Sequence, residues 1–147
     1  MKFVMANDHA AIELKLELKA WLEQRGHEVD DLGVGLDGKA DYPDKGAEAA
    51  RAYMAGGYDY GIVCCGTGIG ISIAANKVKG IRCALPQNAF AATMAKEHNN
   101  ANMIAFGGRI DYPDPPTMML EAFLHADFGG NERHERRVAK IMAVEEG

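Results

Sequence analysis

Hydrophobic and polar residues follow two patterns along this chain, and the switches between them predict strands separated by helices. Short apolar runs, typical of buried strands, cover residues 2–6, 29–32, 60–63, 80–85 and 102–106. In the first intervening segment, Leu14, Leu18 and Leu22 recur at helical spacing, which leaves Lys15 on the polar side. Five strands with helices between them predict an α/β fold, with a parallel sheet covered on both faces.

Glycine, proline and capping residues mark where the helices begin and end. Gly26 ends the first helix, and Asp41-Tyr42-Pro43-Asp44 opens a second that runs to about residue 55. Further helices are expected over residues 71–77, 88–97, from 113–116 onward, and over 132–144. No repeat or linker interrupts this order, so residues 1–147 are expected to form a single domain.

Composition and charge argue against several classes of protein. The chain has 147 residues, of which 48% are hydrophobic and 25% charged, as in ordinary folded domains. Its net charge of −5 gives no reason to expect nucleic acid or an anionic membrane as a partner. No window has the apolar length of a membrane span, and the chain starts in a predicted strand, so we expect no signal peptide.

Cys64, Cys65 and Cys83 are the three cysteines of the chain. Their number is odd, and adjacent cysteines rarely pair with each other. We therefore expect reduced thiols and a cytoplasmic protein.

The most informative segment follows the third strand, where Cys64-Cys65 leads into Gly66-Thr67-Gly68-Ile69-Gly70 and then a helix. Backbone N–H groups of such a loop and helix start can converge on an anion. Successive strand residues face opposite sides, so one of the two thiols must point away from the site. Cys65, at the mouth of the strand, is the candidate base or nucleophile. Cys64 and Cys83 are expected to be small buried apolar residues.

Dinucleotide, metal and redox sites fit this segment poorly. The glycine spacing departs from G-x-G-x-x-G, follows the third strand, and has no acidic residue about 20 positions further on. No two histidines are spaced i, i+4, and there is no C-x-x-C, so we expect neither a metal nor a cofactor. Vicinal thiols also lack the two-residue spacer of thioredoxin-type motifs.

The position of the ligand site follows from the predicted sheet. In open parallel sheets, ligands bind beyond the carboxyl ends of the strands. This rule gathers the following residues at one edge: Asp8, His9, Tyr42, Cys65, Thr67 and Arg109.

Two further polar clusters remain ambiguous when each is considered alone. Residues 97–102, Glu-His-Asn-Asn-Ala-Asn, are either a solvated turn or part of a site. In the last helix, Arg133, Arg137 and Lys140 share one face. That face is either simply solvated or a cationic clamp for a phosphate.

Together these motifs resemble the ribose-5-phosphate isomerase B family, which includes allose-6-phosphate isomerase and the galactose-6-phosphate isomerase subunits. The resemblance covers nearly the whole chain in order. It rests on Asp8-His9-Ala10, Asp41-Tyr42-Pro43, Cys65-Gly66-Thr67-Gly68-Ile69-Gly70, Ser72 to Lys77, Glu97 to Asn102, Gly107-Gly108-Arg109 and Arg133-His134-x-x-Arg137. It implies a Rossmann-like three-layer αβα sandwich with a C-terminal helix, a homodimer or a dimer of dimers, and cofactor-free interconversion of ribose 5-phosphate and ribulose 5-phosphate.

The resemblance also implies roles for individual residues. Cys65 would carry the proton between C2 and C1, Thr67 would donate a hydrogen bond there, and Asn99 would polarise the carbonyl oxygen. His98 would open the sugar ring with help from Asp8, because a histidine can give and take a proton near neutral pH. The remaining residues would bind the substrate or its phosphate: His9, Tyr42, Gly66, Gly68, Gly70, Arg109, Arg133, His134 and Arg137.

Topology predicts that each active site is shared between two subunits. Cys65 lies at the carboxyl end of its strand, whereas His98 and Asn99 precede the fifth strand and so lie near the amino ends. A five-residue strand is about 17 Å long, too far for one imidazole to reach across. A twofold dimer can bring one edge against the other.

Two departures from the family pattern are visible. Residues 86–88, Pro-Gln-Asn, replace a polar trio that many members carry, which puts the choice of sugar in question. Ile71 occupies the position where members without the cysteine have a glutamate, which strengthens the assignment of Cys65. Three alternatives stay open: an isomerase of a hexose 6-phosphate such as allose 6-phosphate, a non-catalytic binder of phosphorylated metabolites, and a thiol redox protein.

Overall fold

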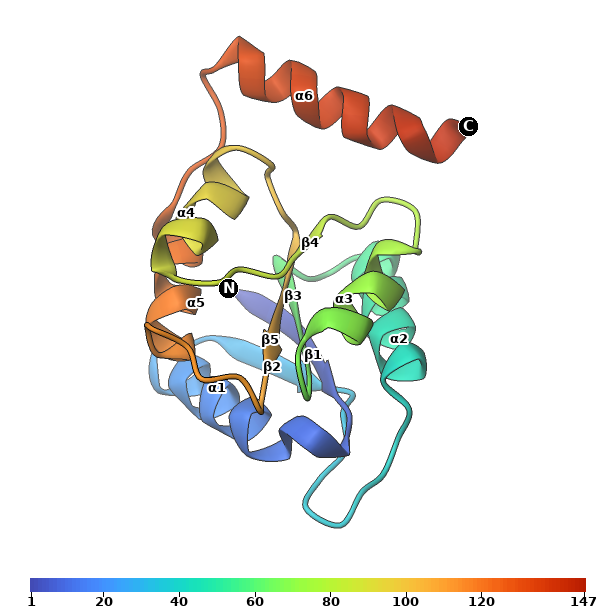
Figure 1. Cartoon of the computed structure of the whole chain (residues 1–147), viewed down its shortest axis with the longest axis vertical. Helices are drawn as coiled ribbons and strands as arrows, with labels where there is room; N and C mark the ends of the chain where they lie inside the picture. Colours follow the sequence, from blue (N-terminus) through green and yellow to red (C-terminus); the bar gives the residue numbers. More distant parts are fainter.

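A five-stranded parallel sheet forms the centre of the molecule in a computed structural model that describes all 147 residues. The strand order is β2-β1-β3-β5-β4. The strands are β1 (Lys2–Asn7), β2 (Glu28–Asp31), β3 (Tyr60–Cys65), β4 (Cys83–Ala84) and β5 (Met103–Gly107). Parallel strands require crossover connections, which the helices supply. Figure 1 shows these helices on both sides of the sheet.

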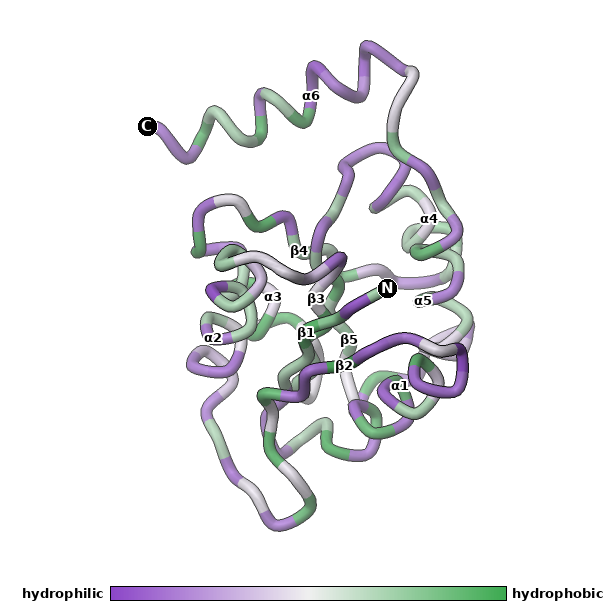
Figure 2. The backbone as a smooth tube through the Cα atoms, turned by 180° about the vertical axis from the view of Figure 1, so that it is seen from behind, coloured by the Kyte–Doolittle hydropathy of each residue, from purple (hydrophilic) through white to green (hydrophobic).

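Two separate hydrophobic cores lie on the two faces of the sheet. One face packs against α1 (Ile12–Gln24), α4 (Ala89–Glu97) and α5 (Pro116–His125), with Phe3, Phe106 and Phe123 among its buried residues. The other packs against α2 (Tyr42–Ala55) and α3 (Ile69–Asn76). The tube in Figure 2 is hydrophobic along most of β1, β3 and β5, as expected for strands buried on both faces. The expected three-layer αβα sandwich is confirmed.

The last helix stands apart from these layers. α6 (Glu132–Ala143) has no buried residue, and it crosses one end of the molecule after a connection from α5 (Figure 1). A short 3₁₀ turn, η2 (Val144–Glu146), follows it. No helix in the structure combines the length and the hydrophobicity needed to cross a membrane.

Three details differ from the sequence expectations. Lys15 is not on a polar surface: it is 2% exposed, and its Nζ contacts Asp31 Oδ2 at 2.6 Å, so an ion pair compensates its burial. The fourth strand is two residues long, not six. Residues 80–82 do not form the first half of this strand. The Asn102 side chain binds this segment instead: its Oδ1 accepts from Arg82 N and its Nδ2 donates to Gly80 O. The helix expected over residues 71–77 begins at Ile69.

Candidate active site

Cys65 lies at the carboxyl end of β3, where the chain leaves the sheet. The side chain is 4% exposed and faces the core on the α2 and α3 side, whereas Cys64 faces the opposite core. The Sγ atom of Cys65 accepts a hydrogen bond from the backbone N–H of Gly68, with an N–S distance of 3.2 Å. This loop amide is a fixed donor of the kind that stabilises negative charge at a reacting atom.

The glycine loop keeps its shape because two of its glycines lie where a side chain would not fit. Gly68 has φ of +79°, in the left-handed region, and a Cβ there would lie 2.9 Å from the carbonyl carbon of Phe106. A Cβ on Gly70 would overlap the ring of Tyr42. Thr67 Oγ1 accepts from Ile69 N at 3.2 Å, at the point where α3 begins. The loop therefore fits tightly between β5 and α2.

Arg109 lies at the cavity of Cys65 because of the register between β3 and β5. Cys65 pairs with Gly107 in the sheet, and the backbone bonds continue beyond it from Gly108 N to Cys65 O and from Arg109 N to Gly66 O. These bonds place the turn after β5 beside the glycine loop. The guanidinium of Arg109 then lines the same cavity as Cys65.

Asp8 and His9 come from the turn after β1. Asp8 Oδ1 caps the first turn of η1 (His9–Ala11) by accepting from Ala10 N at 2.9 Å. His9 Nδ1 lies 3.2 Å from the carbonyl oxygen of Ala40. A carbonyl can only accept, so Nδ1 carries the proton and Nε2 is the nitrogen left for a ligand.

A cavity of about 620 Å³ joins these residues at one edge of the sheet. Its lining includes every residue that the edge rule had gathered, together with Gly66 and Gly70: Asp8, His9, Tyr42, Cys65, Gly66, Thr67, Gly70 and Arg109. Gly68 contributes its N–H to Cys65 rather than a cavity wall. The edge predicted from the sequence is therefore confirmed as a cavity.

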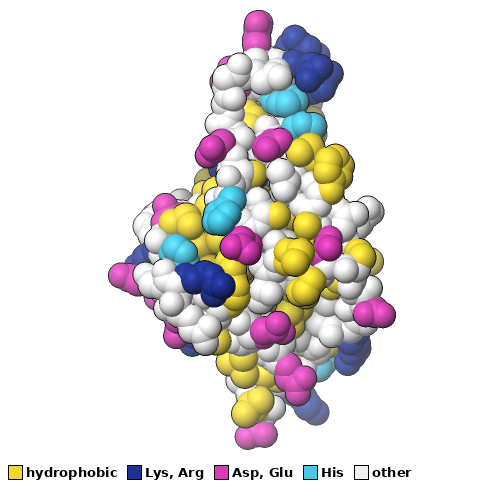
Figure 3. Space-filling view, turned by 90° about the vertical axis from the view of Figure 1, so that its left-hand side faces the viewer, with side chains coloured by type: hydrophobic (Ala, Val, Ile, Leu, Met, Phe, Trp, Pro, Cys, Tyr) yellow, Lys and Arg dark blue, Asp and Glu magenta, His cyan; other side chains and the backbone are white.

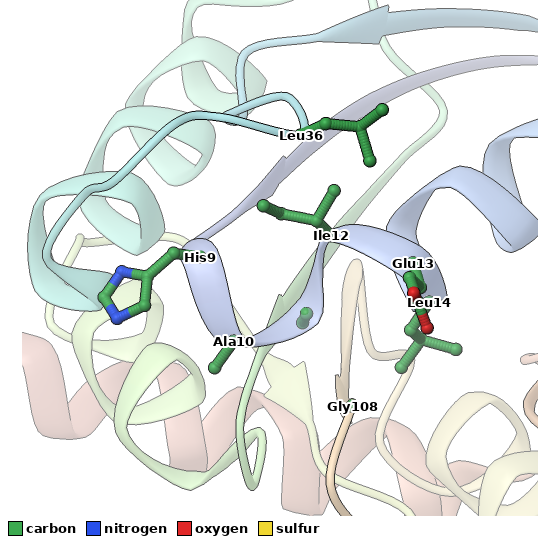
Figure 4. Close-up of a pocket in the computed structure, with 8 residues that line it drawn as sticks. His9, Ala10, Ile12, Glu13, Leu14, Leu36 and Gly108 are labelled. Atoms are coloured by element: carbon green, nitrogen blue, oxygen red, sulfur yellow. The ribbon is translucent and has the colours of Figure 1, made fainter.

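A second, smaller cavity of about 270 Å³ lies on the other side of η1. In Figure 4, Ile12 points toward Leu36 of the loop that connects β2 to α2, and the His9 ring lies away from both. His9 therefore stands between the two cavities and lines both.

The second group of predicted site residues lies elsewhere. His98 ends α4 and Asn99 follows it, just before β5, at the amino ends of the strands. The His98 ring lies against the His134 ring of α6, with centroids 4.2 Å apart. The pKa of His134 is lowered, first by partial loss of hydration and then by His98 and the guanidinium groups of Arg133 and Arg137. Figure 3 shows Lys, Arg and His side chains gathered at this end of the molecule.

The structure thus brings the predicted residues together in two groups and does not bring the groups to each other. None of His98, Asn99, Arg133, His134 or Arg137 lines the cavity of Cys65. Cys65 pairs with Gly107 at one end of the β3–β5 ladder and Gly61 with Met103 at the other. Four residues of strand separate these ends, which is about 13 Å.

Sequence reasoning missed five of the residues that line the cavity, Ala10, Ala40, Asp41, Ile69 and Ile73, and three of them contribute most clearly. The Ala40 carbonyl orients His9, and no side-chain pattern could have identified a backbone acceptor. Ile69 and Ile73 also line the cavity, and their exposed fractions are 51% and 55%, respectively. Their i, i+4 spacing at the start of α3 was the available signal. No group of three or more His, Cys, Asp or Glu side chains is arranged to hold a metal ion.

Comparison with known proteins gives consistent matches over the whole chain. A family model described as Ribose/Galactose Isomerase matches residues 3–141. Ribose-5-phosphate isomerase B of Escherichia coli is 40% identical over 145 residues, which is 99% of this chain and 97% of that protein. The putative sugar phosphate isomerase YwlF of Bacillus subtilis is 40% identical over 147 residues, covering 99% of this chain and 98% of that protein.

Solved structures agree with the sequence matches. Ribose-5-phosphate isomerase B of Clostridium thermocellum superposes with a TM-score of 0.90 at 44% identity, covering 99% of this chain and 98% of that one. The type B ribose 5-phosphate isomerase of Trypanosoma cruzi gives a TM-score of 0.90 at 32% identity, covering 99% of both chains.

Proposed function

This chain belongs to the ribose/galactose isomerase family, and on that premise we propose that it is an aldose–ketose isomerase that interconverts ribose 5-phosphate and ribulose 5-phosphate. The observation that carries the proposal is the setting of Cys65. The Cys65 sulfur accepts a hydrogen bond from a loop N–H at 3.2 Å. Cys65 lines a cavity of about 620 Å³, which Arg109 and His9 also line. A base and two anion-binding groups in one cavity are what a sugar-phosphate isomerase needs.

The reaction moves one proton from C2 to C1 and one hydroxyl proton from O2 to O1 of the sugar. The Cys65 thiolate takes the proton from C2 of the open-chain aldose and returns it to C1, with an enediolate between the two steps. Free thiols ordinarily have a pKa of about 8.5, so a base of this kind depends on donors that stabilise the thiolate. The Gly68 N–H supplies such a donor to the Cys65 sulfur. The Thr67 hydroxyl accepts from the Ile69 N–H, which leaves its own proton to be donated to the enediolate oxygen. The electrons stay within the substrate, so the step requires no redox cofactor.

The phosphate binds through cationic groups at the cavity wall. Arg109 offers a planar fork of donors, which matches phosphate oxygens. His9, oriented by the Ala40 carbonyl, presents Nε2 to the ligand. Arg133 and Arg137 complete the phosphate site in this proposal, and they come from a second subunit.

The shared site follows from the placement of the two groups. His98, which would open the sugar ring, and Asn99, which would polarise the carbonyl, lie at the amino ends of the strands and cannot reach Cys65 of their own chain. In a twofold dimer each edge that carries Cys65 meets the partner's edge that carries His98.

Exposed apolar side chains on both edges support this dimer. Ile69 and Ile73 flank the cavity of Cys65, and Ile141 and Val144 lie in and just after α6. Apolar side chains that are exposed in one subunit are commonly covered by another. A second copy of this chain would cover both sets, because it carries each of them.

The three thiols suit a reducing compartment. All three cysteines are free and buried in the structure. We therefore infer that the enzyme works in the cytoplasm, where such thiols stay reduced.

A coupled assay that measures ribulose 5-phosphate formed from ribose 5-phosphate tests the function. We expect turnover, with a higher kcat/KM for ribose 5-phosphate than for allose 6-phosphate, measured at matched phosphate and salt. A higher value for the hexose would reassign the substrate to a hexose 6-phosphate. Binding of ribose 5-phosphate by calorimetry without turnover of either sugar would favour a non-catalytic binder instead.

A further inference from the structure

Arg82 lies in the segment before β4 and contacts the turn that carries His98 and Asn99. On the basis of the isomerase function proposed above, we propose that Arg82 is a positioning residue, whose guanidinium fixes this turn so that His98 and Asn99 present their side chains to the substrate. Neither the family motifs nor the cavity of Cys65 includes Arg82.

The contacts of Arg82 concentrate on two backbone carbonyls. Nε lies 3.1 Å from the carbonyl oxygens of both Asn99 and Asn100, and Nη2 lies 2.8 Å from that of Asn100. The third nitrogen, Nη1, lies 3.2 Å from the sulfur of Met142 in α6. A planar guanidinium can bind two carbonyls at once in fixed geometry, whereas a lysine ammonium acts as a point charge.

The turn needs such support because of its backbone conformation. Asn100 has φ of +45° and is the only non-glycine residue with positive φ in the chain. Asparagine tolerates this region better than most residues, but the conformation still has to be stabilised by its surroundings. Lys96 supplies a second support, with Nζ 2.7 Å from Asn100 Oδ1. His98 and Asn99 are thus held between the end of α4 and a left-handed residue.

The backbone of Arg82 is itself anchored on both sides. Its N–H donates to Asn102 Oδ1 at 2.8 Å, and the Asn102 amide donates to Gly80 O at 2.8 Å. Gly80 N donates to Glu145 Oε1 at 2.9 Å, just beyond α6. Residues 80–82 therefore connect the turn after α4 with the C-terminal helix that carries His134. This connection sets the position of His98 against His134.

Arg82 lies outside the cavity that binds the sugar, so its removal acts on the reaction through His98 and Asn99. We expect Arg82→Met to lower kcat by about tenfold to a hundredfold, as for groups that orient catalytic side chains elsewhere. We expect KM to change less than about threefold, because Arg109 and His9 lie in the other group of residues, and Arg133 lies at the opposite end of α6 from Met142, which Arg82 contacts.

Arg25→Met is the matched control. Arg25 also donates to a backbone carbonyl, that of Trp21 at 3.1 Å, and its guanidinium lies over the Trp21 ring, so α1 holds it and it has no hydrogen bond to either group of site residues. Both variants lose one positive charge and gain the same side chain. We expect Arg25→Met to keep the kcat of the unmodified enzyme.

Guanidinium rescue separates positioning from a general loss of structure. Arg82 lines two surface cavities of about 220 and 230 Å³, so an added guanidinium ion can reach the space that Arg82→Met leaves. We expect millimolar guanidinium to restore part of the kcat of Arg82→Met, with urea as the comparison, and Arg82→Lys to retain an intermediate kcat. A kcat within twofold of Arg25→Met, or a loss that neither guanidinium nor lysine relieves, would overturn the proposal.

An NMR measurement makes the test independent of activity. We expect the ring protons of His98, assigned with His98→Gln, to shift in Arg82→Met and to stay in place in Arg25→Met. If the unmodified enzyme fails to isomerise ribose 5-phosphate, the proposed function fails, and this shift still decides whether Arg82 holds the turn. If Arg82→Met does not fold, Arg82→Lys takes its place in both measurements. In that case, an unchanged kcat together with unchanged His98 resonances would refute the positioning role of Arg82.

Discussion

Two adjacent cysteines with identical side chains have different environments because strand residues alternate faces. Cys64 is fully buried in the core beneath α1, α4 and α5, and this burial raises the pKa of its thiol far above the ordinary value. Cys65 faces the other side, lines the cavity, and receives the Gly68 N–H. Only Cys65 has both access to a ligand and a donor for its charge.

Replacing Cys65 by alanine should abolish the chemistry and leave the fold intact. We expect kcat to fall by about three decades or more, since the variant lacks the proton carrier, while the dissociation constant for ribose 5-phosphate changes little. The coupled assay and calorimetry measure the two quantities.

Cys64→Ala is the control for this change. Its loss of core packing should cost about 1 kcal/mol of unfolding free energy and leave kcat nearly unchanged. Activity of Cys65→Ala within threefold of the unmodified enzyme would contradict the assignment of the base.

At the scale of elements, the site depends on how closely the glycine loop, α2 and α3 approach each other. Gly70 in the first turn of α3 has no Cβ, and the Tyr42 ring at the start of α2 occupies that space. The contact holds Tyr42 over the cavity that Cys65 lines. The close approach of α2 and α3 therefore determines the position of a side chain at the site.

Gly70→Ala should displace the Tyr42 ring and weaken substrate binding, with a rise in KM of about tenfold or less. Alanine is itself a better helix former than glycine, so α3 should not unfold. In the Tyr42→Ala background the overlap is absent, and Gly70→Ala should then have little further effect on KM. Steady-state kinetics on the four proteins form a double-mutant cycle, and additive effects would show that the contact is irrelevant.

For the protein as a whole, the proposed sharing of each site between two subunits makes activity a property of the dimer. Co-expression of Cys65→Ala with His98→Ala, each inactive alone, tests this arrangement. With shared sites, each mixed dimer contains one doubly damaged site and one intact site. Random mixing makes about half the dimers mixed, so about a quarter of the unmodified activity should return. No recovery, with mixed dimers confirmed by mass spectrometry, would locate each site within one subunit.

We also expect the enzyme to work without a metal ion. The proposed proton transfer uses a thiolate and fixed N–H donors, and no group of three or more metal-ligating side chains is present in the fold. Incubation with EDTA followed by gel filtration should leave kcat unchanged in the coupled assay. A strong loss that one divalent cation reverses would require a different mechanism.

The amino-acid sequence alone was enough to predict the fold class, the family and the edge of the sheet at which the cavity lies. The fold class and the edge depend on local patterns: apolar runs at strand length, helical spacing between them, and polar residues just after strands. The family depends on the order of the motifs along the chain. The alternation of faces along β3 also separated Cys65 from Cys64 correctly. None of these inferences requires knowing which residues distant in the sequence meet in space.

Features that depend on partners distant in the sequence became visible only in the folded structure. Lys15 follows a polar pattern and is nevertheless buried, because Asp31 of β2 supplies the opposite charge. The short β4 and the two orienting contacts, from Ala40 to His9 and from Arg82 to the turn after His98, likewise depend on side-chain or backbone groups from other elements. A periodic pattern contains the polarity of each position but not the identity of its neighbour in space, so these contacts could not be predicted from the sequence.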